Sequence, residues 1–440
     1  MMKFDISRFT SIPWRIKSLA LIFITVTALI VTSLNSAPDQ NIERSVSIPA
    51  TVCPKFDGEA RNTALLPSAK SEIKQATTRK LNFVAARSNP YLISNTSLVV
   101  AGSEATSAVI RSRAGIYTAA TTCLIGSGEQ WFIGPSADLG SFARLLIVNS
   151  GLSTASVEID SYKDSGKVGS RSLAIAAVSQ REIRLDSLAP GAKSVAIRVL
   201  TKAGRVTAFL LDERRSGLRT LGGDFLASYD PGLEIVIPAI PTKSKGRVIS
   251  AHSLRVIATG ARAAIINVEL LSDGSRFIPV GLAEVVINPG EVKTLQLPKS
   301  LGKRPAALLI RSNEPITASV YSQEGNEFSW ATPAQGISNF IFNVGGLEPI
   351  LTLVGDQIEA RVETNSRDGK RQVQIIRGEE MVNWKIPPNT RIVNISTLGT
   401  LLYLGASWST SDGFTSIALN PGTELERSTT PIFDIDALFG

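Results

Sequence analysis

Histidine is almost absent from this chain. His252 is the only histidine among 440 residues. A Ser-His-Asp triad would have to use His252, yet no carboxylate lies close to it in the sequence. We therefore expect a surface or edge histidine. One histidine and two cysteines cannot supply an ordinary zinc site, and the sequence contains neither an acidic calcium loop nor a glycine-rich phosphate loop. We predict no metal ion, no cofactor and no catalytic activity.

Aromatic residues and methionine are also scarce, with five tryptophans, six tyrosines and three methionines. Clefts that bind sugars are usually rich in tryptophan and tyrosine, so these counts argue against a large glycan-binding groove. Paired carboxylates for glycoside cleavage come together only in the fold, and they stay an alternative. Valine, isoleucine and threonine recur along the chain, which favours strands over helices.

The formal net charge of +8 gives little indication of a charged partner. Four cations and one acid lie within residues 1–17, which account for +3 and leave +5 for the rest of the chain. We interpret this remainder as an ordinary solvated surface. Weak attraction to anionic wall polymers or lipid headgroups is the alternative. No stripe of basic and aromatic residues is present, so we expect no nucleic acid partner.

Only one apolar run approaches the length of a membrane span. Residues 19–31 read LALIFITVTALIV and follow the four cations. A helix needs ~17–20 such residues to cross a bilayer, and a cationic flank stays in the cytoplasm. We predict a cytoplasmic tail at 1–17, a single-pass anchor in the cell membrane at 18–37, and the bulk of the chain outside. A cleaved signal peptide, which would make the protein secreted, is the alternative.

Both cysteines, Cys53 and Cys123, follow the predicted anchor. Two thiols outside the membrane are expected to be oxidised to each other. We therefore predict a disulfide that closes a loop of about 70 residues, which the chain-entropy argument values at ~3–4 kcal/mol.

One succession of strands and turns recurs three times along the chain. It begins at the apolar runs 145–149, 254–258 and 350–354. Each run is followed by a second strand, a turn that contains Asp and Gly, and further strand–turn–strand segments. Alternating apolar and polar residues indicate antiparallel strands packed on one face. A repeat of ~100 residues with about seven short strands is typical of an immunoglobulin-like sandwich, and a small barrel is the alternative.

We predict an all-β protein with tandem immunoglobulin-like antiparallel β-sandwich modules after one N-terminal transmembrane helix. The predicted modules are an irregular β module with the disulfide at 41–128 and three β-sandwiches at 129–228, 229–331 and 332–440. Residues 55–80 are polar and weakly periodic, so we expect a long loop there. The junctions are short and lack long Pro/Ser linkers, so we expect a semi-rigid rod.

An acidic residue lies close to an aromatic one just before each repeat. The pairs are Glu129 and Trp131, Asp224 and Phe225, and Glu327 and Trp330. We interpret Trp131, Phe225 and Trp330 as buried aromatics at the junctions between neighbouring modules. A platform on which sugars stack is the alternative interpretation.

Together these features resemble an actinobacterial family of membrane-anchored extracytoplasmic proteins of unknown function. The resemblance rests on the N-terminal span, the segment Val52-Cys53-Pro54, Cys123 shortly before the first repeat, and the sequence of residues 205–226. Lys55 stands where the family more commonly has glycine. The resemblance implies a location in the cell envelope. Members of the family are often encoded close to a large glycosyltransferase. The resemblance supplies no catalytic residues.

We expect a non-enzymatic scaffold or adaptor of the cell envelope. It would hold a wall-synthesis protein or a wall polymer at the outer face of the membrane. Two alternatives stay open: a glycan- or lipid-binding envelope module, and a hydrolase with paired carboxylates.

Overall fold

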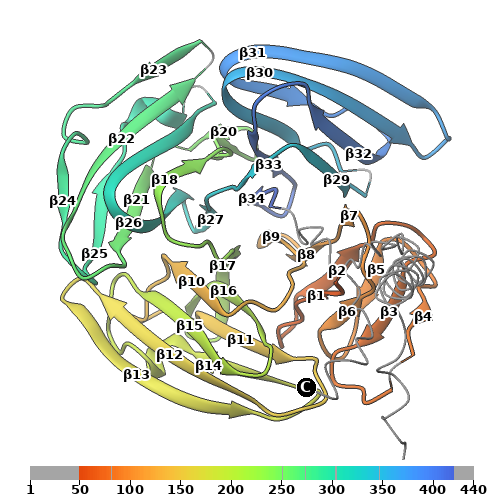
Figure 1. The fold of residues 1–440 in the computed structure, drawn as a ribbon, viewed down its shortest axis with the longest axis horizontal. Coiled ribbons are helices and arrows are strands. Elements are labelled where there is room, and N and C mark those ends of the chain that lie inside the picture. The colour runs from red at the N-terminus through yellow and green to blue at the C-terminus, as the bar shows by residue number, and fades with distance from the viewer. Residues whose placement is uncertain are drawn as a thin grey trace, which may run out of the picture. The chain divides into compact units, whose positions relative to one another are not determined.

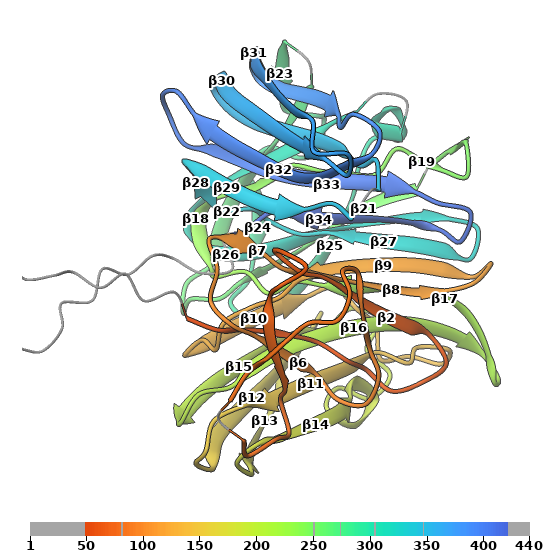
Figure 2. The same ribbon diagram turned by 90° about the vertical axis from the view of Figure 1, so that its right-hand side faces the viewer.

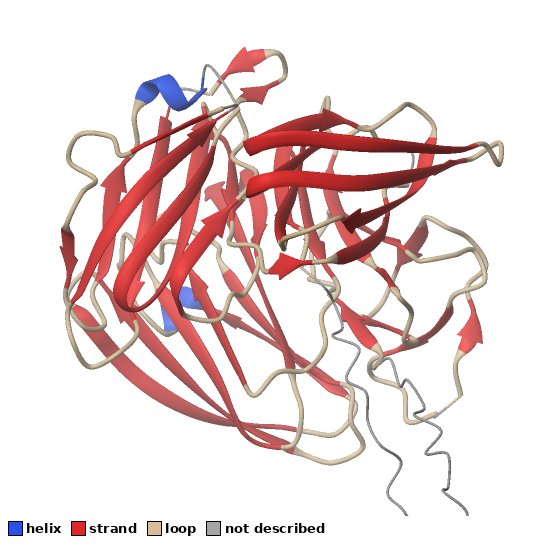
Figure 3. Ribbon diagram, turned by 45° about the horizontal axis from the view of Figure 1, so that its top comes forward, coloured by secondary structure: helices blue, strands red, loops and turns tan. Residues whose placement is uncertain are grey.

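The computed structural model describes residues 49–80, 82–249, 251–272, 274–302, 305–345 and 347–420. These residues all belong to one compact unit, Ile48–Leu425. They form strands and loops, together with two short 3-10 helices, Leu185–Ser187 and Lys299–Gly302 (Figure 3). The predicted all-β class is confirmed for this part of the chain.

The predicted cytoplasmic tail at 1–17 and the predicted anchor at 18–37 lie outside the described residues. Among the residues that are described, no helix is long and apolar enough to cross a membrane.

The strands between residues 129 and 226 form two antiparallel sheets of four strands. One sheet has the order β10-β15-β12-β13, and we call it the outer sheet; the other has the order β14-β11-β16-β17, and we call it the inner sheet. Both sheets contribute to one apolar core, in which Val157 and Ile197 of the outer sheet meet Leu145 and Leu210 of the inner sheet. The bounds are β10 Glu129–Ile133, β11 Arg144–Asn149, β12 Ala155–Lys163, β13 Gly166–Ile175, β14 Ser179–Arg184, β15 Ala196–Ala203, β16 Thr207–Ser216 and β17 Arg219–Leu226.

The same order of pairing occurs four times within the described residues. The first sandwich, at 51–122, has the outer sheet β1-β6-β3-β4 and the inner sheet β5-β2-β8-β9. The third, at 232–331, has the outer strands β18, β26 and β22, edged by β23 and β24, and the inner sheet β25-β21-β26-β27. The fourth, at 339–418, has the outer sheet β29-β32-β30-β31 and the inner sheet β31-β30-β33-β34. The sandwich at 129–226 is the second of the series.

The long strands β26, β30 and β31 pass from the outer to the inner sheet of their own sandwich. The bounds in the first sandwich are β1 Thr51–Cys53, β2 Arg61–Leu65, β3 Glu72–Gln75, β4 Val84–Ala85, β5 Tyr91–Ile93, β6 Leu98–Val100, β7 Ala105–Thr106, β8 Ala108–Arg113 and β9 Tyr117–Thr122. The bounds in the third are β18 Gly232–Ile237, β19 Lys243–Ser244, β20 Arg247–Val248, β21 Ala251–Ala258, β22 Ala264–Ser272, β23 Ser275–Phe277, β24 Val285–Ile287, β25 Val292–Gln296, β26 Ala307–Glu324 and β27 Glu327–Ala331. The bounds in the fourth are β28 Gly336–Ile337, β29 Asn339–Asn343, β30 Ile350–Ser366, β31 Arg371–Lys385, β32 Thr390–Thr397, β33 Leu402–Ser409 and β34 Phe414–Ala418.

The first sandwich corrects the expectation of a long loop at 55–80. That segment contains β2 and β3, which occupy the same positions in the pairing order as β11 and β12. The two strands are only five and four residues long. Segments this short carry too few alternating positions to show a period of two, and most of their residues are polar.

The inner sheets are buried on both faces. In β11, Leu145 and Ile147 face the core of their own sandwich, whereas Leu146 and Val148 pack against the first sandwich. In β21, Leu254 and Val256 likewise face their own core, and Ile257 packs against the second sandwich. Strands that are buried on both faces are continuously apolar, because neither face meets water.

The four sandwiches close into a ring. Their last strands, β9, β17, β27 and β34, contact one another in sequence, and β34 contacts β9 in turn, at the centre of the arrangement in Figure 1. The closure is supported by a parallel pairing of β7 with β29 and by a hydrogen bond of 2.6 Å from the Asn343 side chain to the Leu66 carbonyl. The expectation of a semi-rigid rod is therefore wrong for the described residues, since the last sandwich packs on the first.

Candidate functional site

A small cavity of the described chain lies on the axis of the ring, where the four last strands meet. A cavity there measures about 10 Å3, room for roughly one water molecule. Thr121, Phe225, Trp330 and Ser416 line it, one from each of the four strands. The site is therefore built by all four sandwiches together.

Asp224 is the buried acid of this axis and has no exposed surface. Its Oδ1 accepts hydrogen bonds from the Phe225 backbone N–H and the Thr415 hydroxyl, both at 2.9 Å. Its Oδ2 accepts a third from the Trp330 backbone N–H at 2.9 Å. Burial raises the pKa of Asp224 to about 8, although these donors favour the ionised form. One carboxyl group thus ties together strands of the second, third and fourth sandwiches.

Trp330 joins this acid to a second one. Its indole Nε1–H donates a hydrogen bond of 3.1 Å to Oδ2 of Asp212, whose side chain is also fully buried. Burial raises the pKa of the Asp212 carboxyl as well. Asp212 and Asp224 both accept hydrogen bonds from Trp330, so they are candidates for a pair of carboxyl groups that exchange protons with a substrate. Paired carboxylates do this in glycosidases. Because neither side chain is exposed, a substrate cannot reach them in this arrangement, and we interpret both acids as structural.

A third buried acid lies at the junction of the first and second sandwiches. Glu213 accepts a hydrogen bond of 2.7 Å from the Tyr117 hydroxyl and forms ion pairs with Arg144 at 2.9 Å and Arg111 at 3.5 Å. Burial alone would raise the pKa of Glu213, but Arg144 and Arg111 bring that pKa below its usual range. The Arg111 side chain is only 1% exposed, and its guanidinium also donates to the backbone carbonyl of Phe56. This network fastens the two sandwiches to each other.

The structure buries the three predicted junction aromatics. Trp131, on β10, is 3% exposed and packs with Ile257 of the third sandwich. Phe225 lies 5.9 Å from the ring of Phe56 in the first sandwich, measured between centroids. Phe225 and Trp330 meet at the axis, whereas Trp131 belongs to the first strand of the second sandwich. These three side chains therefore offer no exposed face on which a sugar could stack.

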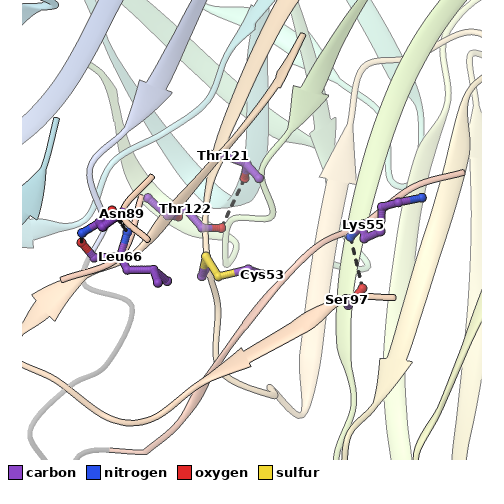
Figure 4. The surroundings of a disulfide bond; sticks show 8 residues. Cys53, Lys55, Leu66, Asn89, Ser97, Thr121 and Thr122 are labelled. Carbon is purple, nitrogen blue, oxygen red and sulfur yellow. Dashed lines mark hydrogen bonds between the residues drawn. A yellow bond between two sulfur atoms is a disulfide. The ribbon is translucent and has the colours of Figure 1, made fainter. Parts of the chain in front are cut away.

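The predicted disulfide between Cys53 and Cys123 is present, and both residues are fully buried. Cys53 ends β1 of the outer sheet, and Cys123 directly follows β9 of the inner sheet. Figure 4 shows the bridge with its neighbours, among them the hydrogen bond of 3.1 Å from the Lys55 backbone N–H to Ser97 Oγ. The bridge joins the two sheets of a sandwich whose strands are short.

The expectation for His252 was wrong, because this residue is 3% exposed rather than on the surface. It lies on β21, and its ring nitrogens contact Ser322 Oγ at 2.9 Å and the Ile249 carbonyl at 3.2 Å. Burial lowers the pKa of His252, so the neutral form is favoured. Among the described residues, no three His, Cys, Asp or Glu side chains are grouped so that they could hold a metal ion.

The sequence interpretation did not single out Asp212, Glu213 or Arg111 as functional. A signal was available for two of them, since β16 reads TAFLLDERRS and places four charges directly after an apolar run. Charged residues inside a strand that is otherwise buried indicate buried ion pairs at an interface. The signal for Arg111 was weaker, because β8 is short and half polar.

Likeness to solved structures is weak. The crystal structure of Thermotoga maritima 1070 matches with a TM-score of 0.21 at 23% sequence identity, covering 24% of this chain and 94% of that one. The Streptomyces avermitilis α-L-rhamnosidase, complexed with L-rhamnose, matches with a TM-score of 0.13 at 10% identity, covering 79% of this chain and 54% of that one. Scores this low support no argument about fold or function.

No curated protein matches this chain. The model of DUF5719, a family of unknown function, matches residues 94–374. This range begins within the first sandwich and ends within the fourth, so it includes most of the ring. The chain therefore belongs to the DUF5719 family.

Proposed function

We propose that this protein is a non-enzymatic scaffold or adaptor of the cell envelope. In this proposal an N-terminal anchor at 18–37 holds the ring at the outer face of the cell membrane, where it binds a wall-synthesis protein or a wall polymer. The observation that carries the proposal is the closed ring, in which buried apolar side chains lie at every junction between neighbouring sandwiches. Such a ring cannot bend at its junctions without exposing core residues, so it is a rigid support.

The buried disulfide supports a compartment outside the cytoplasm. Disulfides form and persist in oxidising surroundings and are rare in the reducing cytosol. The resemblance to an actinobacterial, membrane-anchored family agrees with this compartment. We include in the proposal that the sandwiches at 129–228, 229–331 and 332–440 are immunoglobulin-like modules.

The two sides of the ring differ in a way that suits an adaptor. Figure 2 shows the described chain beginning and ending toward one side, while the tips of the hairpins β8–β9, β16–β17 and β33–β34 lie toward the other. With an anchor before residue 49, the side with the hairpin tips would be turned away from the membrane. Leu139 and Leu218 are fully exposed near the β16–β17 hairpin, where the Arg215 backbone N–H donates to the Gly140 carbonyl at 2.7 Å. We place the partner's contact on this side.

Photocrosslinking in native membranes tests the adaptor role. A photoreactive residue in place of Leu218 should capture an envelope protein or a wall polymer, whereas the same residue in place of the buried Phe225 should capture none. Mass spectrometry of the purified adducts identifies what was bound. If position 218 gives adducts only with lipid, the lipid-binding alternative gains support, and if it gives no adduct the adaptor proposal fails.

A further inference from the structure

Arg255 occupies an unusual position at the junction of the second and third sandwiches. It lies on β21, and its guanidinium carbon is 5.1 Å from the ring centroid of Trp330 and 5.6 Å from that of Tyr321. These two rings are themselves 4.8 Å apart, so they form one aromatic wall beside the cation. These rings attract the cation and restrict the position of the guanidinium.

Two of the three side-chain nitrogens of Arg255 lack acceptors in the part of the chain that the structure describes. Its Nε and Nη1 are buried, and no hydrogen-bond partner for either lies among the described residues. Arg111 provides the contrast, because its nitrogens reach the Tyr117 hydroxyl at 2.9 Å, the Phe56 carbonyl at 3.0 Å and Asn62 Oδ1 at 3.1 Å. Burying a guanidinium costs free energy unless its donors find acceptors, so an unpaired one in the same protein requires an explanation.

A second guanidinium lies nearby, because Arg214 neighbours Asp212, which accepts the hydrogen bond from the Trp330 indole. Arg214 has a buried Nε without a hydrogen bond, 3.7 Å from Oδ1 of the fully buried Asp212. Its Nη1 lies 3.5 Å from Oδ1 of Asp138, whose side chain is 40% exposed. The Arg214 side chain is itself 23% exposed, so the cluster reaches the surface of the ring. Burial, together with the charge of Arg214, lowers the pKa of Arg255 to about 10.

We propose that Arg255 and Arg214 form a binding site for a phosphate group. The planar fork of a guanidinium matches two oxygens of a phosphate, and the remaining oxygens can accept hydrogen bonds from a second arginine. A phosphate presents more acceptor oxygens than a carboxylate, so it can make more hydrogen bonds to two guanidiniums. The aromatic wall of Trp330 and Tyr321 holds Arg255 in place before the ligand arrives, which limits the entropy lost on binding. The site does not depend on the adaptor role proposed above.

Titration of the full-length protein with inorganic phosphate tests the site. Potassium chloride keeps the ionic strength constant, and tryptophan fluorescence reports binding because the Arg255 guanidinium lies beside the Trp330 ring. We expect saturable binding that is at least tenfold weaker in Arg255→Gln. The Arg262→Gln variant removes the same charge from a side chain that is 81% exposed, and it should bind phosphate as the unchanged protein does. Equal binding by Arg255→Gln, or an equal loss in Arg262→Gln, would overturn the proposal.

Folding of the variants is checked by thermal unfolding without phosphate. Arg255→Gln removes an unpaired buried charge, so its melting temperature should not fall below that of the unchanged protein. If it does not fold, Arg214→Gln replaces it, since that side chain is partly exposed, and the same tenfold loss is required.

The source of the phosphate is separated by two further probes. Binding of glycerol 3-phosphate without binding to vesicles of phosphatidylglycerol assigns the site to a soluble or polymer-borne phosphate. Binding to the vesicles that is lost in Arg255→Gln assigns it to a lipid headgroup. Binding of neither probe, with no binding of inorganic phosphate, overturns the proposal.

Discussion

The burial of Asp224 predicts that the free energy of unfolding depends on pH. Its pKa is about 8 in the folded protein, against an ordinary value of 3.8 that applies to the unfolded chain. Between these two values the folded state binds more protons than the unfolded state. The free energy of unfolding must therefore fall as the pH rises through this window. The contribution is fully present below pH 3.8 and is lost by about pH 8.

The magnitude follows from 1.36 kcal/mol per pKa unit. Between pH 5 and pH 9 the folded state should lose about 4 kcal/mol through this one carboxyl group, with no reduction for solvent screening because Asp224 is fully buried. Replacing Asp224 with asparagine keeps the shape of the side chain and removes the titration. The difference in stability between the unchanged protein and Asp224→Asn should therefore shift by about this amount, in favour of the variant at high pH.

Urea unfolding of the full-length protein at pH 5, 7 and 9 measures this difference. Asp164→Asn, which makes the same substitution at an exposed carboxyl group in the turn after β12, is the matched control. A constant difference for Asp224→Asn would refute the reasoning. It would mean that the three hydrogen-bond donors keep the carboxylate ionised in spite of its burial.

Four further changes have expected outcomes that denaturant midpoints can check. Cys53→Ser should lower the free energy of unfolding by ~4 kcal/mol, as expected for opening a loop of 70 residues, and a loss below ~1 kcal/mol would contradict this. Phe225→Ala should cost ~3–5 kcal/mol because the ring is 2% exposed at a junction, and a neutral result would show that the junction is loose. Gly405→Val should cost ~1–3 kcal/mol, since even a Cβ at this glycine would lie 2.6 Å from a neighbouring alanine, whereas Gly169→Val meets no atom within 4 Å and should be close to neutral. Glu213→Gln should cost ~3–5 kcal/mol, because it removes the negative charge that balances Arg111 and Arg144 in a buried network. The unchanged protein should lose this contribution only as the pH falls below about 4.5, so equal losses at pH 7 and pH 3 would contradict the assignment.

Local patterns in the sequence predicted the strands well. Alternation along 155–162 indicated a half-buried strand, and β12 occupies Ala155–Lys163. The disulfide was also predictable, because only two cysteines follow the predicted anchor. The first sandwich was not recognised as a repeat, since β1, β5 and β6 have three residues each and carry no readable period.

The closure of the ring was missed although the sequence holds a sign of it. The run Leu145 to Val148 does not alternate, as a strand with one exposed face would. At the start of each repeat, apolar residues occupy both faces of the strand. This indicates that a second surface covers the strand, and in the structure this surface is the preceding sandwich. The buried charges could not be paired from the sequence, because Arg111 and Glu213 are separated by 102 residues and meet only through the ring.

Closure of the ring is tested most directly by joining its two ends. The hydroxyl oxygens of Thr118 in the first sandwich and Thr410 in the fourth lie 2.9 Å apart, although 292 positions separate them in the sequence. A protein with Thr118→Cys and Thr410→Cys should form an intramolecular disulfide under mild oxidation, seen as a linked peptide by mass spectrometry. If the new cysteines stay unlinked while the bridge between Cys53 and Cys123 forms, the four sandwiches do not close into a ring.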